Sequence, residues 1–463
     1  MRYSVTQLAR LTVLAVLCAA TVAHAKSDSG ADAFVTWGKS AMVPLPIVPP
    51  AAAGWSDLQP LGDMIGAASI VALSEGVHAG AEPLEMRNRL FQYLVQEKGF
   101  SAIAIESGIV EGKVVYDYVR GGAGELSTVL HQGVSWTFDH LPQNKELIRW
   151  IRQYNANPGV TRKINFYGFD VPGSPGNPMA SRGTETALTE VLKYLAKVDS
   201  AVATGFQTRL STLVPRVHFD PGKNDGQGYQ ALTAAERDTV TAAIDDLVTL
   251  LERKEAVYSA AGSANDYEWA YRAAIGARQV DNWLRQMPAG TAAIDLSKYM
   301  SMATDVRDRG QADNLGWIIQ REGPQGKVLV FASRYHLSSV PIKMGKWTGK
   351  SEEQAQQVAG TYLRRRLGDR LFTIGNLVGG GAFGCAGFSM TLKPMPPESI
   401  DGLAGRFGPP WFVLDVRRAP AAVAAWLGQE QQLGDEDFPM RLPMSKAYDA
   451  LLYMKTVQPA CPK

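Results

Sequence analysis

Short apolar runs that each end beside an ionisable side chain are the most constraining feature of this sequence. Four such runs occur, each of strand length, with helical patterns between them. Runs of this kind are typical of buried strands in a mostly parallel sheet. Ligands gather beyond the carboxyl ends of such strands, because the connecting loops converge there. We therefore expect one site from the residues that end or follow the runs, which are Glu75 with His78, Glu106, Asp170 and His336.

The first 25 residues have the pattern of a secretory signal peptide. Arg2 and Arg10 flank the start, residues 11–22 form an apolar stretch too short to span a bilayer, and Ala23-His24-Ala25 supplies the small residues of a cleavage site. We predict cleavage after Ala25, and hence a periplasmic or secreted protein with no membrane span once the signal is removed. An uncleaved anchor helix is the alternative.

The charge balance and the cysteine content limit the partners and the compartment. The chain has 463 residues and a formal net charge of only +2, with no basic patch, so we expect no nucleic-acid partner. After signal cleavage the remaining cysteines are Cys385 and Cys461. In an exported protein they would form either one disulfide or two buried thiols, and their spacing does not decide between these alternatives.

The pattern along the chain predicts an α/β protein with a mostly parallel central sheet, flanking helices and an inserted helical cap subdomain. Residues 26–62, rich in proline and alanine, are expected to form an extended lead-in to a domain that covers 63–463. From about 182 to 321 helix-length segments follow one another without a convincing strand. We interpret that stretch as a cap over the strand ends. Further strands are expected near residues 327–332, 371–378, 411–416 and 451–457.

The densest chemistry lies between Glu75 and Glu106. Glu75 and His78 are three residues apart at a predicted strand end, so a carboxylate and an imidazole lie within about one turn of each other. An imidazole titrates near neutral pH and, when held in place, can remove a proton from water. Arg87, on the helix that follows, could stabilise a developing oxyanion, and Glu106 could accept from Arg87 or orient an imidazole. A purely structural Arg87–Glu106 ion pair is the alternative.

A second candidate cluster combines Arg307 and Asp308 on a predicted helix with His336 after a strongly apolar strand. The polar face of this helix could point at the strand ends. A solvated charged helix face is the alternative for Arg307 and Asp308, and a structural histidine is the alternative for His336.

Several familiar catalytic and binding motifs are absent or incomplete. The sequence has no Gly-x-Ser-x-Gly nucleophile elbow, which argues against the usual α/β serine hydrolase. Residues 345–351 end in Gly-Lys-Ser, but Met344 stands where a P-loop requires glycine. Residues 379–384 match a dinucleotide fingerprint, yet the prolines at 394, 396 and 397 leave no room for the helix that must follow.

The order of several short motifs resembles the erythromycin esterase family. The segment from Ser74 to Glu82 is similar to the Gly-Glu-x-x-His-x-x-x-Glu motif of that family, and it is followed by an arginine and then by a strand that ends in glutamate. The resemblance extends from about Ile70 to Val457. Further matching stretches are 167–170, 307–308 with Ala312 and Asn314, 414–417 and 448–453.

The resemblance implies hydrolysis of a carboxylic ester or lactone, as in the ring opening of macrolide antibiotics, and no metal or other cofactor. It implies that His78 is the general base and that Glu75, Arg87, Glu106 and His336 complete the catalytic set. The expected substrate-binding residues are Glu82, Asp170, Arg307 and Asp308. The expected partner is a small-molecule ester or lactone.

The sequence departs from the family pattern at three positions. Ser74 replaces the usual glycine, Gln311 replaces a typical methionine, and Ser333-Arg334 stands where an Ala-His-Asn segment is expected, so that only His336 of two histidines is present. Two other functions stay open. One is a metal-dependent hydrolase that uses His78, His336, Glu106 or Asp170 as ligands. The other is a non-catalytic periplasmic binding or envelope protein.

Overall fold

The computed structural model describes residues 30–46, 54–173, 182–219, 228–287, 296–344, 354–385 and 387–461, with the side chains of 296–303 excepted. The predicted signal peptide therefore lies outside the described residues. No described helix is both long enough and apolar enough to cross a membrane.

A central eight-stranded sheet organises the molecule, in the order β1-β13-β16-β10-β2-β7-β3-β4. Five of its seven strand pairings are parallel, and the two that involve β13 are antiparallel. The prediction of a mostly parallel sheet is confirmed. Its strands are β1 (Val43–Pro44), β2 (Ile70–Glu75), β3 (Ala102–Gly108), β4 (Asn165–Asp170), β7 (Val328–Ser333), β10 (Leu371–Val378), β13 (Trp411–Asp415) and β16 (Ala450–Met454).

Alternation of side chains along these strands divides the core between the two faces of the sheet. In β2, Ile70 and Ala72 belong to one apolar cluster, whereas Val71 and Leu73 belong to another. All six residues of β2 are buried, as are all seven of β3. Such continuous burial is what a parallel sheet covered on both faces requires.

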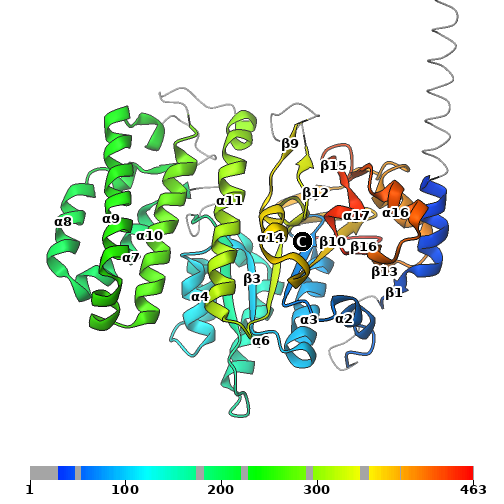
Figure 1. Cartoon of the computed structure of the whole chain (residues 1–463), viewed down its shortest axis with the longest axis horizontal. Helices are drawn as coiled ribbons and strands as arrows, with labels where there is room; N and C mark the ends of the chain where they lie inside the picture. The colour runs from blue at the N-terminus through cyan, green and yellow to red at the C-terminus, as the bar shows by residue number, and fades with distance from the viewer. Residues whose placement is uncertain are drawn as a thin grey trace, which may run out of the picture.

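Helices cover both faces and extend the molecule beyond the β4 edge. The green helices α7 to α10 stand together on one side in Figure 1, and α11 lies between them and the sheet, where it packs on β4. The helices before the insertion are α2 (Gln59–Ile65), α3 (Ala81–Lys98), α4 (Gly112–Val119), α5 (Leu126–Gly133) and α6 (Pro142–Ala156). Those of the predicted insertion are α7 (Glu185–Val198), α8 (Ser200–Leu210), α9 (Ala234–Ala261), α10 (Ala264–Leu284) and α11 (Leu296–Glu322).

Smaller elements complete the C-terminal half. The further helices are α12 (Arg334–Leu337), α14 (Ala359–Leu367), α15 (Ile400–Ala404), α16 (Ala421–Leu427) and α17 (Met444–Ala447). A hairpin joins β11 (Ala382–Cys385) to β12 (Phe388–Thr391), and a four-stranded sheet contains β14 (Glu430–Leu433), β15 (Met440–Pro443), β8 (Ile342–Lys343) and β9 (Ala355–Gln356). The pair β5 (Arg182–Gly183) and β6 (His218–Phe219) lies in the insertion. Short 3-10 turns, among them η2 (Phe138–His140), link the elements.

The expected extended lead-in is not what the structure contains. Residues 30–41 are helical, α2 occupies 59–65, and β1 pairs with the edge strand β13. The helix forms because Phe34 packs against Phe407 and Trp426, and because the first proline of the segment comes only at position 44. The outer boundaries of the domain and of the cap stay predictions.

Candidate active site

Four adjacent parallel strands bring the predicted residues to one edge of the sheet. The order β2-β7-β3-β4 is continuous, and Glu75 of β2 is in register with Ser333 of β7. Asp170 of β4 pairs with Gly108 of β3, two residues beyond Glu106. The carboxyl ends of these strands therefore form a common floor, as the sequence predicted.

His78 is held by Glu75 immediately after β2. Its Nδ1 lies 2.7 Å from Oε1 of Glu75, and its side chain is 45% exposed, whereas that of Glu75 is 4% exposed. Because a carboxylate only accepts, the bond places a proton on Nδ1, and Nε2 is left as the proton acceptor of the neutral ring. Desolvation alone would lower the pKa of His78, but the hydrogen bond and charge of Glu75, together with the charge of Glu106, raise it above its ordinary value.

His336, on α12, sits between two carboxylates. Its Nδ1 lies 2.8 Å from Asp308 Oδ1, and its Nε2 lies 3.2 Å from Glu106 Oε1. Burial opposes the charge of the ring, but Asp308 and Glu106 outweigh burial and raise the pKa of His336 to about 9. In turn, burial would raise the pKa of Glu106, yet His336, His78 and Arg307 hold it well below its usual value. At neutral pH His336 is therefore a cation and Glu106 an anion.

The protonation state of His336 selects its partner at Nε2. This atom also lies 3.1 Å from Nη1 of Arg307, which can only donate. A protonated Nε2 donates to Glu106, whereas a neutral ring with its proton on Nδ1 accepts from Arg307. Because the pKa is raised, the first arrangement is favoured at neutral pH. His336 is then a poor base, and the role of base falls to His78.

Arg307 of α11 joins two of the strand ends. Its guanidinium lies 2.8 Å from Glu106 Oε1 and 2.6 Å from Asp170 Oδ2. Burial would raise the pKa of Asp170, but Arg307 and Arg182 lower it below its ordinary value. The pKa of Arg307 is raised in spite of desolvation, because Asp170 and Glu106 surround the cation with negative charge. The alternative of a solvated helix face therefore does not describe Arg307.

Of the two partners expected for Glu106, the structure contains the imidazole, that of His336, and not Arg87. In the described part of the chain the Arg87 guanidinium donates to Asn88 and to Asn144, the latter at 2.8 Å, and it lies over the ring of Phe331. Arg87 is 1% exposed, and desolvation lowers its pKa to about 10 although Glu75 opposes the change. Arg87, Glu75 and Glu106 nevertheless line one small cavity.

Three of the predicted substrate-binding residues have other contacts. Glu82 accepts the backbone N–H of Gln458 at 2.8 Å, at the start of α3 and outside the His78–His336 cluster. Asp170 and Asp308 are each 0% exposed. Besides His336, Asp308 accepts the backbone N–H of Ala359. A side chain without exposed surface cannot touch a ligand directly, so this burial favours a supporting role for Asp170 and Asp308.

Several residues of the site carried little or no sequence signal. Trp136 lies over both Arg182 and Arg307, with its ring 3.8 Å and 5.6 Å from the two guanidinium carbons. Phe138 packs its ring 5.5 Å from that of His78. Asn144 lies in the first turn of α6, and its side chain binds Arg87.

Two departures from the family pattern have polar functions here. Gln311, in place of a typical methionine, donates to Asp170 Oδ1 at 3.1 Å. Ser333, within the altered Ala-His-Asn segment, donates its backbone N–H to Glu106 Oε2 at 3.0 Å. Both contacts add a donor to a buried carboxylate that Arg307 also binds. The loss of one histidine thus leaves the Glu106–His336 pair in place.

The residues proposed as metal ligands already form hydrogen bonds and ion pairs with other side chains of the site. Within the described ranges, no group of three or more His, Cys, Asp or Glu side chains is arranged to hold a metal ion. His336 uses both ring nitrogens, and Asp170 is bound by Arg307, Arg182 and Gln311. A cation at the same atoms would have to displace these partners.

The Asp308 carboxylate is expected to control the charge of His336. The substitution Asp308→Asn removes the largest favourable interaction of the imidazolium and should lower the His336 pKa from about 9 toward 6.5, as followed by NMR titration. Because the folded pKa is raised, its contribution to stability is fully present below pH 6.5 and is lost as pH rises through about 9. The variant should lose this pH dependence.

Asp313→Asn is the matched control for this substitution. Asp313 lies on the same helix, is 50% exposed and pairs with Arg309. The His336 titration should be unchanged in this control. An unchanged titration in Asp308→Asn as well would remove Asp308 from its assigned role.

The fold and this site define a class of α/β proteins whose acid–base residues cluster at the carboxyl edge of a parallel sheet. The erythromycin esterase family model matches residues 95–457, and the chain belongs to this family. Glu75, His78 and Arg87 precede the matched range. Their assignment therefore depends on the local motif and on the geometry described above.

Individual relatives are distant in sequence and similar in fold. Erythromycin esterase type II of Escherichia coli is 22% identical over 67% of this chain and 70% of its own length. The putative hydrolase YbfO of Bacillus subtilis is 23% identical over 74% of this chain and 72% of its own length. The family and these relatives indicate a hydrolase.

Solved structures confirm the fold over most of the chain. A Bacillus cereus protein gives a TM-score of 0.74 at 24% identity and covers 93% of this chain and 98% of its own. A mutant of the erythromycin esterase EreC in its open conformation gives 0.68 at 17% identity, with 90% and 98% covered.

Proposed function

We propose that this protein is an exported hydrolase that cleaves a carboxylic ester or lactone with water activated by His78. The observation that carries this proposal is the 2.7 Å bond between His78 Nδ1 and Glu75 Oε1. It fixes the tautomer and the direction of a half-exposed imidazole. In the described part of the chain Nε2 of His78 has no hydrogen-bond partner, so it is free to accept a proton from water.

In the proposed reaction one proton moves from water to His78 and then from His78 to the leaving group. His78 Nε2 removes a proton from water as the oxygen attacks the carbonyl carbon, and Glu75 stabilises the imidazolium that forms. The tetrahedral intermediate then expels the alkoxide, which takes the proton from Nε2. The products are a carboxylic acid and an alcohol, or one hydroxy acid when the substrate is a lactone. An oriented carboxylate–imidazole pair typically contributes two to four orders of magnitude to such a step, roughly 10²–10⁴-fold.

The cations of the site supply the complementary charge. His336 and Arg307 offset Glu106 and Asp170, so that the floor of the site is not strongly anionic despite its carboxylates. Arg87 lines the same cavity as Glu75 and can attract negative charge that develops nearby. We assign Arg87 to electrostatic stabilisation, and we assign Glu106 and His336 to holding the polar framework around His78.

Relatives suggest the substrate class. Two E. coli relatives have the name erythromycin esterase, one of type I and one of type II. A macrolide lactone or another ester of comparable size is therefore the substrate class that we propose. Export is proposed from the signal-like N-terminus and from the Cys385–Cys461 disulfide, because disulfides persist in oxidising compartments.

The direct test is hydrolysis by the purified protein. Macrolides and simple chromogenic esters are incubated with the protein, and ring opening is followed by a mass increase of one water. We expect turnover that is insensitive to a metal chelator. Turnover lost with chelator and restored by added metal would favour the metal-dependent alternative. Binding of every compound without turnover would favour the non-catalytic alternative.

A further inference from the structure

A disulfide lies beside the loop that carries His78. Cys385 ends β11 and Cys461 lies near the C-terminus, 76 residues later, with their Cα atoms 4.8 Å apart. The sequence left open whether these cysteines pair, and the structure joins them. Both residues are only partly buried, so a small reductant can reach the bond.

The residues that directly precede the two cysteines both bind the backbone of Ala79, the neighbour of His78. The Ala79 carbonyl accepts the N–H of Gly384 and the N–H of Ala460, both at 3.0 Å. These donors directly precede Cys385 and Cys461 in the chain. Ala79 has a φ of +55°, which costs an L-residue about 1 to 2 kcal/mol and requires compensating contacts. The disulfide ties together the two segments that supply those contacts.

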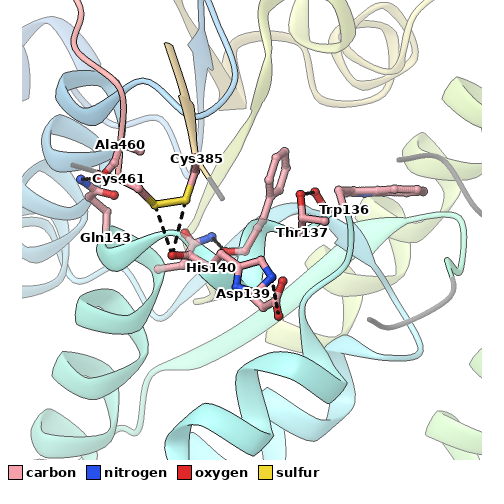
Figure 2. Close-up of a disulfide and its surroundings, with 10 residues drawn as sticks. Trp136, Thr137, Asp139, His140, Gln143, Cys385, Ala460 and Cys461 are labelled. Carbon is pink, nitrogen blue, oxygen red and sulfur yellow. Dashed lines mark hydrogen bonds and ion pairs between the residues drawn. A yellow bond between two sulfur atoms is a disulfide. The ribbon is translucent and has the colours of Figure 1, made fainter. Parts of the chain in front are cut away.

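A second contact runs from the disulfide to the ring that packs on His78. The two sulfur atoms lie 3.7 Å and 3.6 Å from the carbonyl oxygen of His140, as Figure 2 shows. His140 belongs to η2, which begins at Phe138, and the Phe138 ring lies 5.5 Å from the His78 ring. The disulfide is therefore connected to His78 by two routes, through the backbone of Ala79 and through the turn that carries Phe138.

We infer that the Cys385–Cys461 disulfide is a positioning device for the His78–Glu75 pair, so that the protein reaches full hydrolytic competence only when oxidised. This inference builds on the proposed function, in which His78 is the base. Neither cysteine touches the reacting atoms. Their effect passes through Ala79 and through the 138–140 turn.

Reduction is expected to loosen the loop without unfolding the protein. A dithiol such as dithiothreitol breaks the S–S bond by delivering two electrons and two protons, which gives two thiols and oxidised reductant. The segments that end at Cys385 and Cys461 then remain joined by backbone hydrogen bonds, such as that from the Ala460 N–H to Gly384 O at 3.1 Å, and hold the two donors to Ala79 less firmly. His78 moves relative to Glu75, so the interaction that raises the His78 pKa weakens.

The experiment compares oxidised and reduced wild-type protein by readouts that need no substrate. NMR titration should show the His78 pKa falling toward 6.5 on reduction, and the amides of Gly384 and Ala460 should exchange at least several-fold faster. With a hydrolysed ester, kcat should fall by roughly tenfold to a hundredfold, the loss expected when a catalytic group is misplaced by about 1 Å. The variant Cys385→Ser/Cys461→Ser should match the reduced protein and should not respond to reductant.

Val413→Ala controls for stability alone. Val413 is buried in β13, three strands away from β2. This variant should lower the unfolding temperature while leaving the His78 titration and the two amides unchanged. Identical titration and exchange in oxidised and reduced protein would overturn the inference. Altered titration and exchange with no hydrolysis in either state would preserve it and would reject the proposed function instead.

Discussion

Replacing His78 with alanine is expected to lower kcat/KM for ester or lactone hydrolysis by about 100- to 10,000-fold, the usual contribution of a general base. The variant loses the group at this strand end whose Nε2 can take a proton from water near neutral pH. It also leaves the buried Glu75 carboxylate without this partner, so we expect the free energy of unfolding to fall by about 1 to 3 kcal/mol. The measurement is initial-rate hydrolysis of the best substrate, with thermal unfolding as a check of the fold.

The pH profile makes this test specific. The base works when neutral, so kcat/KM should rise with pH through the His78 pKa, which lies above 6.5. His78→Ala should lose this rising limb as well as the rate. His218→Ala is the matched control, because His218 is exposed and its Nδ1 bonds to the backbone carbonyl of Pro215. Equal rates and equal profiles for wild type and His78→Ala would exclude His78 as the base.

The grouping of polar residues at the strand ends could be predicted from the sequence, because the apolar strands and the polar residues that end them are both local features. The strands at Ile70–Glu75 and Val328–Ser333 are apolar runs with clear polar ends. Parallel pairing of such runs places their ends on one edge whatever the remaining fold, so Glu75, Glu106 and Asp170 could be grouped in advance. The Glu75–His78 contact follows from a spacing of three residues.

Side-chain contacts between segments far apart in the sequence could not be predicted in the same way. Glu106 was expected to accept from Arg87 or to orient an imidazole, and it does the second, through His336. Arg307, from a helix some two hundred residues later, binds Glu106 in place of Arg87, and Arg87 binds Asn144. The spacing of residues in the sequence does not indicate which of two arginines contacts a given carboxylate in the folded protein. The helix at 30–41 was missed because it is stabilised by the packing of Phe34 and Val35 on residues far away in the sequence.

The site therefore has two electrostatic parts that depend on each other. One is the Glu75–His78 pair, and the other is the buried group formed by Glu106, His336 and Arg307. Glu106 links them, because its charge raises the pKa of both histidines. Removing the positive charge around Glu106 should therefore change the free energy of unfolding more than it changes the proton transfer at His78.

Replacing Arg307 with methionine tests this second part and should have the largest effect on stability. The change keeps most of the side-chain volume but leaves Glu106 and Asp170 buried without their shared cation. Breaking a buried ion pair from one side typically costs about 3 to 5 kcal/mol, so we expect a loss of that size in the free energy of unfolding at pH 7. Urea denaturation measures it directly.

The loss should depend on pH in a defined direction. The folded pKa of Asp170 is lowered, so its contribution to stability is present above the ordinary value of 3.8 and disappears as pH falls through the folded pKa. In Arg307→Met the two carboxylates can regain neutrality by binding protons, so the difference from wild type should shrink at acidic pH. Arg309→Met, two residues along α11 at a side chain 62% exposed, should cost no more than about 0.5 kcal/mol at any pH. Similar losses in the two variants, or a loss that does not shrink on acidification, would show that Arg307 does not hold the buried carboxylates in their charged form.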